Sequence, residues 1–174
     1  YDGKKAKEVT RTVKVVNEDQ PTDEMNVTLS PNKTEGYSKA VTVSVSTTGN
    51  VSSLTYKLNN GESQEITNNQ IILDQDGEYI IEVTAIDNES NTKTVTSETY
   101  YIDVTPPTII FEEGDTGLSI STSKVVGYDL KTGVIVEDNH EISLDNVTTS
   151  GELSAQEGTY SITYTATDIA GNRS

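Results

Sequence analysis

Residues 77–91 read GEYIIEVTAIDNESN, and residues 158–172 read GTYSITYTATDIAGN. Gly, Tyr, Ile, Ala, Asp and Asn recur at one spacing, 81 residues apart, since Gly77 is matched by Gly158. Polar and apolar side chains alternate through both copies, as half-buried strands require. The period predicts tandem domains, with one β unit in each repeat.

The rest of the chain shows the same alternation, with no long helical periodicity. Asn-Gly and Asp-Gly turn signals such as Asn60-Gly61 and Asp76-Gly77 separate the runs at the spacing typical of a β-sandwich. The sequence therefore predicts an all-β fold. Strands are expected near residues 25–29, 40–46, 53–58, 64–66, 70–73, 78–86 and 93–103, then near 108–111, 117–121, 124–127, 133–137, 142–149 and 158–167.

Proline marks the expected joints, because it cannot donate to a central β-ladder. Pro21 follows one alternating run, and Pro106-Pro107 follows another. The boundaries fall near residues 20 and 105. The expected parts are the last strand of a preceding domain plus a linker (1–19), one β-sandwich (20–105), and a second β-sandwich that lacks its last strand (106–174).

The two ends match this division. Residues 4–16 form an orphan strand, and the repeat predicts a further strand after Asn172. A fragment of a longer array explains both. The alternative is strand complementation, in which residues 4–16 of one copy fill the missing edge in another copy. Charge favours such a pairing, because residues 1–16 hold five basic and two acidic residues in a chain of net charge −16.

Composition excludes several function classes. The net charge of −16 disfavours nucleic acid and anionic lipid as partners. The absence of cysteine excludes thiol catalysis and Cys-ligated metals, and a single histidine, His140, argues against a His-based triad. The sequence shows no signal peptide and no stretch long enough for membrane insertion.

Residues 106–174 resemble the immunoglobulin-like repeats of bacterial cell-surface proteins. The motifs that carry the resemblance are Pro107-Thr-Ile-Ile, Val136-Glu-Asp138-Asn139, and Gly158 through Asn172. Residues 50–107 resemble a sister group through Leu54-Thr-Tyr56, Asp76-Gly77-Glu-Tyr79 and Ile102-Asp103-Val-Thr-Pro106-Pro107. The resemblance implies tandem Ig-like β-sandwich domains of a Gram-positive-type surface or secreted protein.

Within an Ig-like sandwich, Tyr79 and Tyr160 would begin the penultimate strand. A tyrosine there packs its ring and sends its hydroxyl back to the backbone, in the arrangement called a tyrosine corner. Gly77 and Gly158 precede these tyrosines by two residues. Ile81 and Ile162 would stand where antibody domains place a disulfide cysteine, and an apolar side chain suits a chain without cysteine.

The acidic turns allow two interpretations. Asp87 and Asp168 begin turns that end at Asn91 and Asn172, and such side chains ordinarily cap backbone N–H groups. Alternatively, Asp87, Asp103, Asp168 and Asn172 supply oxygen ligands for calcium at the domain joints.

A metal site is less strongly indicated at residues 138–141, because the glycine that the family often carries in this acidic turn is missing. The neighbouring carboxylates of Glu137 and Asp138 are interpreted as solvated surface groups. His140, on a predicted loop beside these acids, is interpreted as a surface residue.

These features favour a non-catalytic structural stalk or spacer, or an adhesin module, outside a bacterial cell. Its expected partners are neighbouring Ig-like domains of the same array. Two alternatives remain open: a module that binds carbohydrate or a host protein, and an accessory β-domain of a large secreted glycosidase. Enzyme activity is not expected, because a thin sandwich offers no deep cleft for paired carboxylates.

Overall fold

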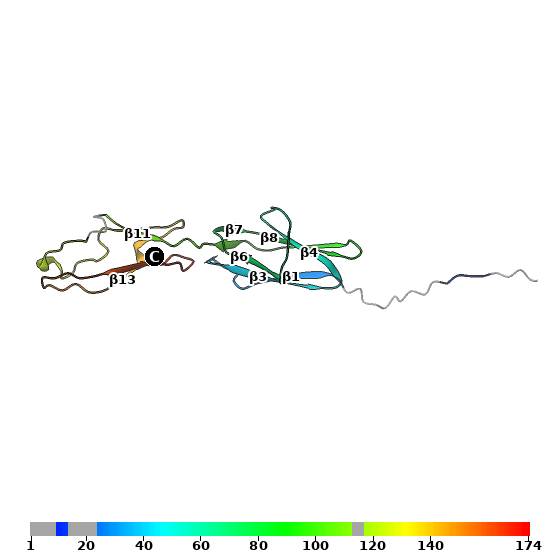
Figure 1. Ribbon diagram of the computed structural model, residues 1–174, viewed down its shortest axis with the longest axis horizontal. Helices are drawn as coiled ribbons and strands as arrows, with labels where there is room; N and C mark the ends of the chain where they lie inside the picture. Colours follow the sequence, from blue (N-terminus) through cyan, green and yellow to red (C-terminus); the bar gives the residue numbers. More distant parts are fainter. Residues whose placement is uncertain (1–9, 14–23, 113–116) are drawn as a thin grey trace, which may run out of the picture.

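The computed structural model describes residues 10–13, 24–112 and 117–174. All regular structure there is β, apart from two single-turn 3-10 helices, η1 (Thr122–Lys124) and η2 (Leu144–Asn146). The all-β prediction is therefore confirmed. The strands gather in two bodies along the long axis of the molecule, which we call the N-terminal unit (β1–β10) and the C-terminal unit (β11–β14) (Figure 1). No helix in the described residues is long and apolar enough to cross a membrane.

The N-terminal unit contains three sheets. The first has the order β1-β3-β6, the second β5-β4-β8-β9, and the third β2-β10-β7. All neighbouring strands are antiparallel except β10 and β2, which run parallel. The strands are β1 (Asn26–Pro31), β2 (Tyr37–Ser38), β3 (Val41–Thr48), β4 (Val51–Leu58), β5 (Gln64–Glu65), β6 (Gln70–Leu73), β7 (Gly77–Tyr79), β8 (Ile81–Asp87), β9 (Thr92–Thr96) and β10 (Tyr100–Ile102).

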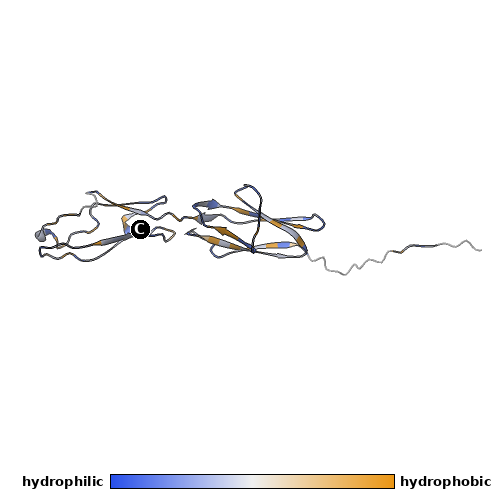
Figure 2. Cartoon of the chain, in the orientation of Figure 1, coloured by the Kyte–Doolittle hydropathy of each residue, from blue (hydrophilic) through white to orange (hydrophobic). Residues whose placement is uncertain are grey.

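Period-two alternation builds the core of this unit. Every second residue from Val41 to Val45 in β3 and from Ile81 to Ala85 in β8 is buried, and apolar residues follow these strands in Figure 2. Because successive side chains of a strand point to opposite faces, each strand buries one face and exposes the other. The buried cluster contains Val27, Val41, Val43, Val45, Ile71, Leu73, Ile81, Val83, Ala85, Tyr100 and Ile102.

The C-terminal unit contains two antiparallel pairs. β11 (Thr108–Phe111) pairs with β12 (Val134–Glu137), and β13 (Val147–Ser150) pairs with β14 (Thr163–Ala166). Its fully buried apolar residues in the described part are Val134, Val147 and Ala166. Far fewer apolar side chains are buried here than in the N-terminal unit.

The strands predicted at residues 117–121 and 124–127 are wrong. Gly117 and Gly127 adopt φ values of +94° and +78°, which lie outside the β region. η1 occupies residues 122–124 between them, and residues 117–121 pair with no described strand. The two strands predicted at 142–149 and 158–167 exist but are shorter, because η2 takes the first part of one and β14 begins only at Thr163.

The tyrosine hydroxyls turn back to the backbone in both units. The Tyr79 hydroxyl donates to the carbonyl oxygen of Gln75 at 3.2 Å, and the Tyr160 hydroxyl donates to that of Gln156 at 3.1 Å. Both acceptors lie four residues upstream. The repeated sequence therefore forms the same local corner twice.

Glycine two residues before the tyrosine has a steric reason in the N-terminal unit. Gly77 has a φ of +149°, and a Cβ there would lie 3.3 Å from the Tyr79 ring, closer than ordinary van der Waals contact. A Cβ at Gly158 would lie 3.4 Å from the Tyr160 hydroxyl, which is an ordinary contact distance, so space alone does not require glycine there. The two isoleucines differ in burial, since Ile81 is fully buried and Ile162 is half-buried.

The predicted strand at residues 4–16 lies largely outside the described residues. Residues 10–13 are described, and they are exposed and form no strand. The strand-complementation hypothesis depends on the remaining residues of this segment.

Ile81 and Ile80 provide a test of the β8 register. Ile81 is fully buried, whereas Ile80 is 43% exposed. We expect Ile81→Val to lower the free energy of unfolding by about 1 kcal/mol, because it removes a packed methyl group. Ile80→Val should change it by less than about 0.5 kcal/mol. Urea denaturation measures both, and equal effects would contradict this register.

Candidate cation site at the joint between the units

The linker between β10 and β11, residues 103–107, is fastened to the N-terminal unit by Asp76. One carboxylate oxygen of Asp76 accepts from the Val104 N–H at 2.6 Å, and the other accepts from the Thr105 hydroxyl at 2.6 Å. These hydrogen bonds, the Thr105 bond foremost, hold the pKa of Asp76 below its ordinary value of 3.8. The turn before β7 is therefore hydrogen-bonded directly to the linker.

The C-terminal unit is hydrogen-bonded to the same linker through Asn172. The Asn172 Nδ2 donates to the carbonyl oxygens of Asp103 at 2.9 Å and Thr105 at 3.4 Å. It also donates to Asp168 Oδ2 at 2.7 Å. All three partners are acceptors, so the amide must present its nitrogen to them. Asn172 is buried in this position and acts as a donor that connects the linker to the turn after β14.

Side chains from the two units also meet beside the linker. The ring of Tyr37, in β2, lies 4.2 Å from the ring of His140, measured between centroids. The ring of Tyr101, in β10 of the same unit, lies 5.4 Å from the ring of Tyr37, measured between centroids. The sequence predicts a surface residue at His140, but this side chain is half-buried in the contact. The joint is thus a packed interface with Pro107 buried within it.

Three aspartates converge at this interface. Asp103 follows β10, Asp138 follows β12, and Asp168 lies two residues beyond β14. Each offers a carboxylate oxygen, and these oxygens all lie within 4.8 Å of one another. Asp103 is completely buried and Asp168 is 7% exposed, whereas Asp138 is half-buried. The ends of three strands from both units therefore form one acidic cluster.

Hydrogen bonds satisfy only part of this cluster. Asp168 accepts from the N–H and side-chain amide of Asn172, and Asp103 Oδ1 accepts from the Thr105 N–H and Asn139 Nδ2. Asp103 Oδ2 and both carboxylate oxygens of Asp138 are buried and have no hydrogen-bond partner within the described residues.

Burial is the main cause that raises the pKa of Asp138. The backbone N–H of Asn139, which lies near Asp138 but makes no full hydrogen bond to it, and His140 offset this only in part, and the charges of Asp103 and Asp168 add to the increase. The pKa of Asp138 is raised because its ionised form has lost water and gained like-charged neighbours.

The cluster is electrostatically costly. Two unit charges 4.8 Å apart repel by about 3 kcal/mol at an effective dielectric constant of 20. Within the described residues none of the three carboxylates forms an ion pair. The Cε of Lys39 would lie 3.9 Å from a Cβ placed on Gly171, in the turn after β14. The Lys39 ammonium group nevertheless forms no ion pair with any of the three aspartates. Carboxylates in this arrangement suit a hard cation.

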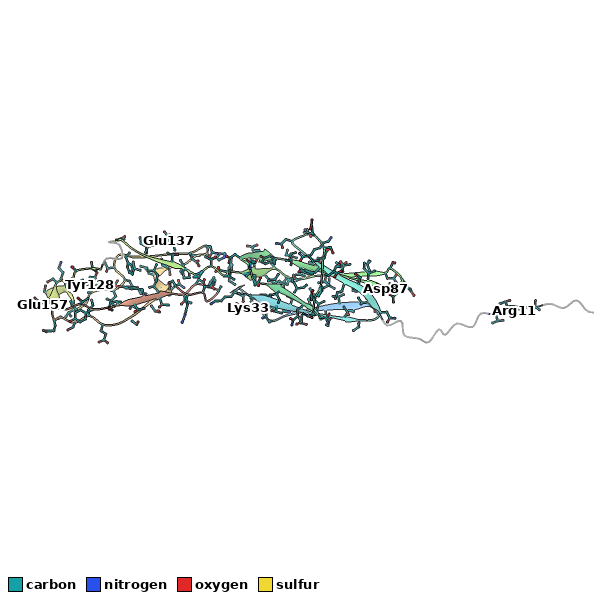
Figure 3. All side chains as sticks on the ribbon, in the orientation of Figure 1. Arg11, Lys33, Asp87, Tyr128, Glu137 and Glu157 are labelled. Atoms are coloured by element: carbon teal, nitrogen blue, oxygen red, sulfur yellow. The ribbon has the colours of Figure 1, made fainter. Side chains whose placement is uncertain are left out.

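The four residues predicted as calcium ligands separate into two groups. Asp103, Asp168 and Asn172 come together at the joint, with Asn172 as a hydrogen-bond donor. Asp87 lies at the end of the N-terminal unit that faces away from the C-terminal unit (Figure 3). Its carboxylate accepts from the Asn91 N–H at 2.9 Å and from Asn91 Nδ2 at 2.8 Å. Turn capping accounts fully for Asp87.

The two turns share the hydrogen bonds between aspartate and asparagine, although Asp87 also accepts from the Glu89 N–H, and they have different neighbours. β3 and β12 are equivalent strands, since each pairs antiparallel with the first strand of its unit. Residues 41–50, which include β3 and the residues after it, carry no acidic side chain, whereas Asp138 follows β12. Asp87 therefore has no carboxylate neighbour equivalent to Asp138.

Asp138 is the residue that sequence reasoning missed. The interpretation of Glu137 and Asp138 as solvated groups is right for the exposed Glu137 and wrong for Asp138. The signal that could have found Asp138 is strand alternation. Counting by twos from the buried Val134 through Val136 reaches Asp138 on the inner face.

In comparisons with known proteins, no family model, no curated protein and no solved structure matches this chain. Function is therefore inferred from the geometry of the joint.

Asp76 should make the stability of the chain depend on pH in the acid range. Because its folded-state pKa lies below 3.8, its stabilising effect is present above about pH 4 and is lost as the pH falls through the folded pKa. In chelator, Asp76→Asn should lower Tm at pH 7, and this difference should shrink below about pH 4. Asp74→Asn, an exposed change in the same turn, is the control. A constant difference from pH 7 to 2 would disprove this role.

Proposed function

We propose that this chain is a non-catalytic spacer in which two Ig-like β-sandwich units follow one another through a stiff joint. The observation that supports this function best is the double attachment of residues 103–107. Asp76 holds the linker from the N-terminal unit, and Asn172 holds it from the C-terminal unit. A spacer of this kind acts by fixing the distance and direction between whatever is attached at its two ends.

The double attachment matters because units joined by a short chain ordinarily move relative to one another. Here a rotation of the Val104 backbone would break its N–H hydrogen bond to Asp76, and the side-chain hydroxyl of Thr105 donates to the same carboxylate. The Tyr37–His140 contact opposes bending at a second point. The joint therefore transmits the orientation of one unit to the next.

An Ig-like character is supported by the paired sheets around one core and by the tyrosine corner in each unit. The acidic, cysteine-free composition suits a place outside the cell, on the surface of a bacterium or in a secreted protein. The partners of such a unit are neighbouring units of the same array.

A cavity in the C-terminal unit is the feature that would favour a ligand-binding module instead. Its volume is about 710 Å³, and its lining includes the aromatic rings of Phe111, Tyr128 and Tyr164. The lining stops at Glu112 and resumes at Gly117, on either side of residues outside the described part. A binding function is therefore not proposed from this cavity.

Removal of the Asn172 side chain tests the spacer. In the wild type, backbone ¹⁵N relaxation of the full chain should give both units one overall tumbling time. Asn172→Ala should free the linker and give the two units separate, shorter times, because its amide no longer bonds to the Asp103 and Thr105 carbonyls.

Asn91→Ala is the matched control for this experiment. It removes the same amide from the equivalent turn at the far end of the N-terminal unit, where it bonds only to Asp87. This variant should keep the single tumbling time. Separate tumbling of the units in the wild type would contradict the proposed function.

A further inference from the structure

We propose that Asp103, Asp138 and Asp168 bind one calcium ion between the two units. Their carboxylate oxygens lie within 4.8 Å of one another. Asp103 comes from the end of the N-terminal unit, whereas Asp138 and Asp168 come from separate strands of the C-terminal unit. An ion held by all three would connect the units directly.

The unpartnered oxygens indicate a ligand independently of the clustering. Asp103 is completely buried, yet its Oδ2 accepts no hydrogen bond within the described residues. Buried carboxylates are ordinarily paired, hydrogen-bonded or metal-bound, because an unpaired buried charge is strongly disfavoured. Both oxygens of Asp138 share this state, and one carboxylate oxygen of each of these residues belongs to the cluster. A cation bound in the cluster would compensate the charge of these buried carboxylates.

Capping of the turn does not explain these oxygens. The Asn172 hydrogen bonds occupy Asp168 in the same way as the Asn91 hydrogen bonds occupy Asp87. Within the described residues, only the second of these two turns takes part in a cluster of three carboxylates. Asp103 and Asp138 need an explanation beyond the turn.

The spacing agrees with a single calcium ion. Calcium binds oxygen ligands at about 2.4 Å, so two oxygens on opposite sides of one ion are at most about 4.8 Å apart. The three oxygens meet this limit. Side chains from three separate strand ends form an irregular set, which calcium accepts more readily than magnesium with its strict octahedral geometry. Zinc prefers nitrogen and sulfur ligands, which this cluster does not offer.

Calcium binding would add a third fastening to the joint. The hydrogen bonds from Asp76 and Asn172 hold the linker, whereas the ion would tie the end of β10 to the ends of β12 and β14. This consequence rests on the proposed spacer function. The binding site itself rests only on the cluster and its unpartnered oxygens.

Calorimetric titration of the full chain with calcium tests the site, with Asp138→Asn as the variant and Glu137→Gln as the matched control. Both substitutions remove one negative charge from adjacent residues, but Glu137 is exposed (Figure 3). We expect one calcium per chain in the wild type and in Glu137→Gln. The affinity of Asp138→Asn should be at least tenfold weaker.

Thermal unfolding provides a readout that separates a ligand from a structural residue. In chelator, Asp138→Asn should be at least as stable as the wild type, because it removes one of three repelling charges. At about 1 mM calcium, the range of extracellular modules, the wild type and Glu137→Gln should gain Tm and Asp138→Asn should not.

Three results would overturn the proposal: no calcium binding by the wild type, an equal Tm gain in Asp138→Asn, or an equal Tm gain with magnesium. Failure of the spacer function is distinguishable from these. Separate tumbling of the units with calcium bound would reject the stiff joint and leave the binding site intact.

Discussion

The hydrogen bonds from Asn172 to the carbonyl oxygens of Asp103 and Thr105 are the interaction on which the arrangement of this chain depends. They join residues 67 or more positions apart in sequence. Because the same side-chain amide also donates to Asp168, it connects the turn after β14 directly to the linker. The burial of Asn172 and Asp103 follows from this contact, and so does the approach of three carboxylates at the joint.

One sequence motif forms two similar turns at two ends of the molecule. The Asp87–Asn91 and Asp168–Asn172 turns share a capping carboxylate, a hydrogen bond donated by the asparagine side-chain amide to that carboxylate, and a residue of positive φ before the asparagine. The second turn alone meets a linker. The same turn chemistry can therefore also form part of an interface with a neighbouring unit. Asp138, the acidic residue that follows β12, adds a carboxylate to that interface.

Much of the N-terminal unit was predictable because β3 and β8 each bury apolar side chains at three alternate positions, from Val41 to Val45 and from Ile81 to Ala85. The strands predicted at residues 117–121 and 124–127 are wrong because short alternation, such as Leu118-Ser-Ile120, does not reveal whether a partner strand exists. The acidic cluster was predictable in part. Asp103 and Asp168 stand beside recognisable turn and proline signals. Strand alternation places Asp138 on the inner face of its unit, but its approach to Asp103 depends on how the two units pack, which no local pattern records.

Residual dipolar couplings of the full chain, weakly aligned in calcium-containing buffer, test the central claim most directly. If the joint is stiff, couplings from β1–β10 and from β11–β14 fit one alignment tensor with the arrangement of units seen in Figure 1. Two tensors of clearly different magnitude would mean that the units reorient independently. The contacts of Asp76, Asn172 and Tyr37 would then fail to hold the joint, which would contradict a spacer of fixed direction.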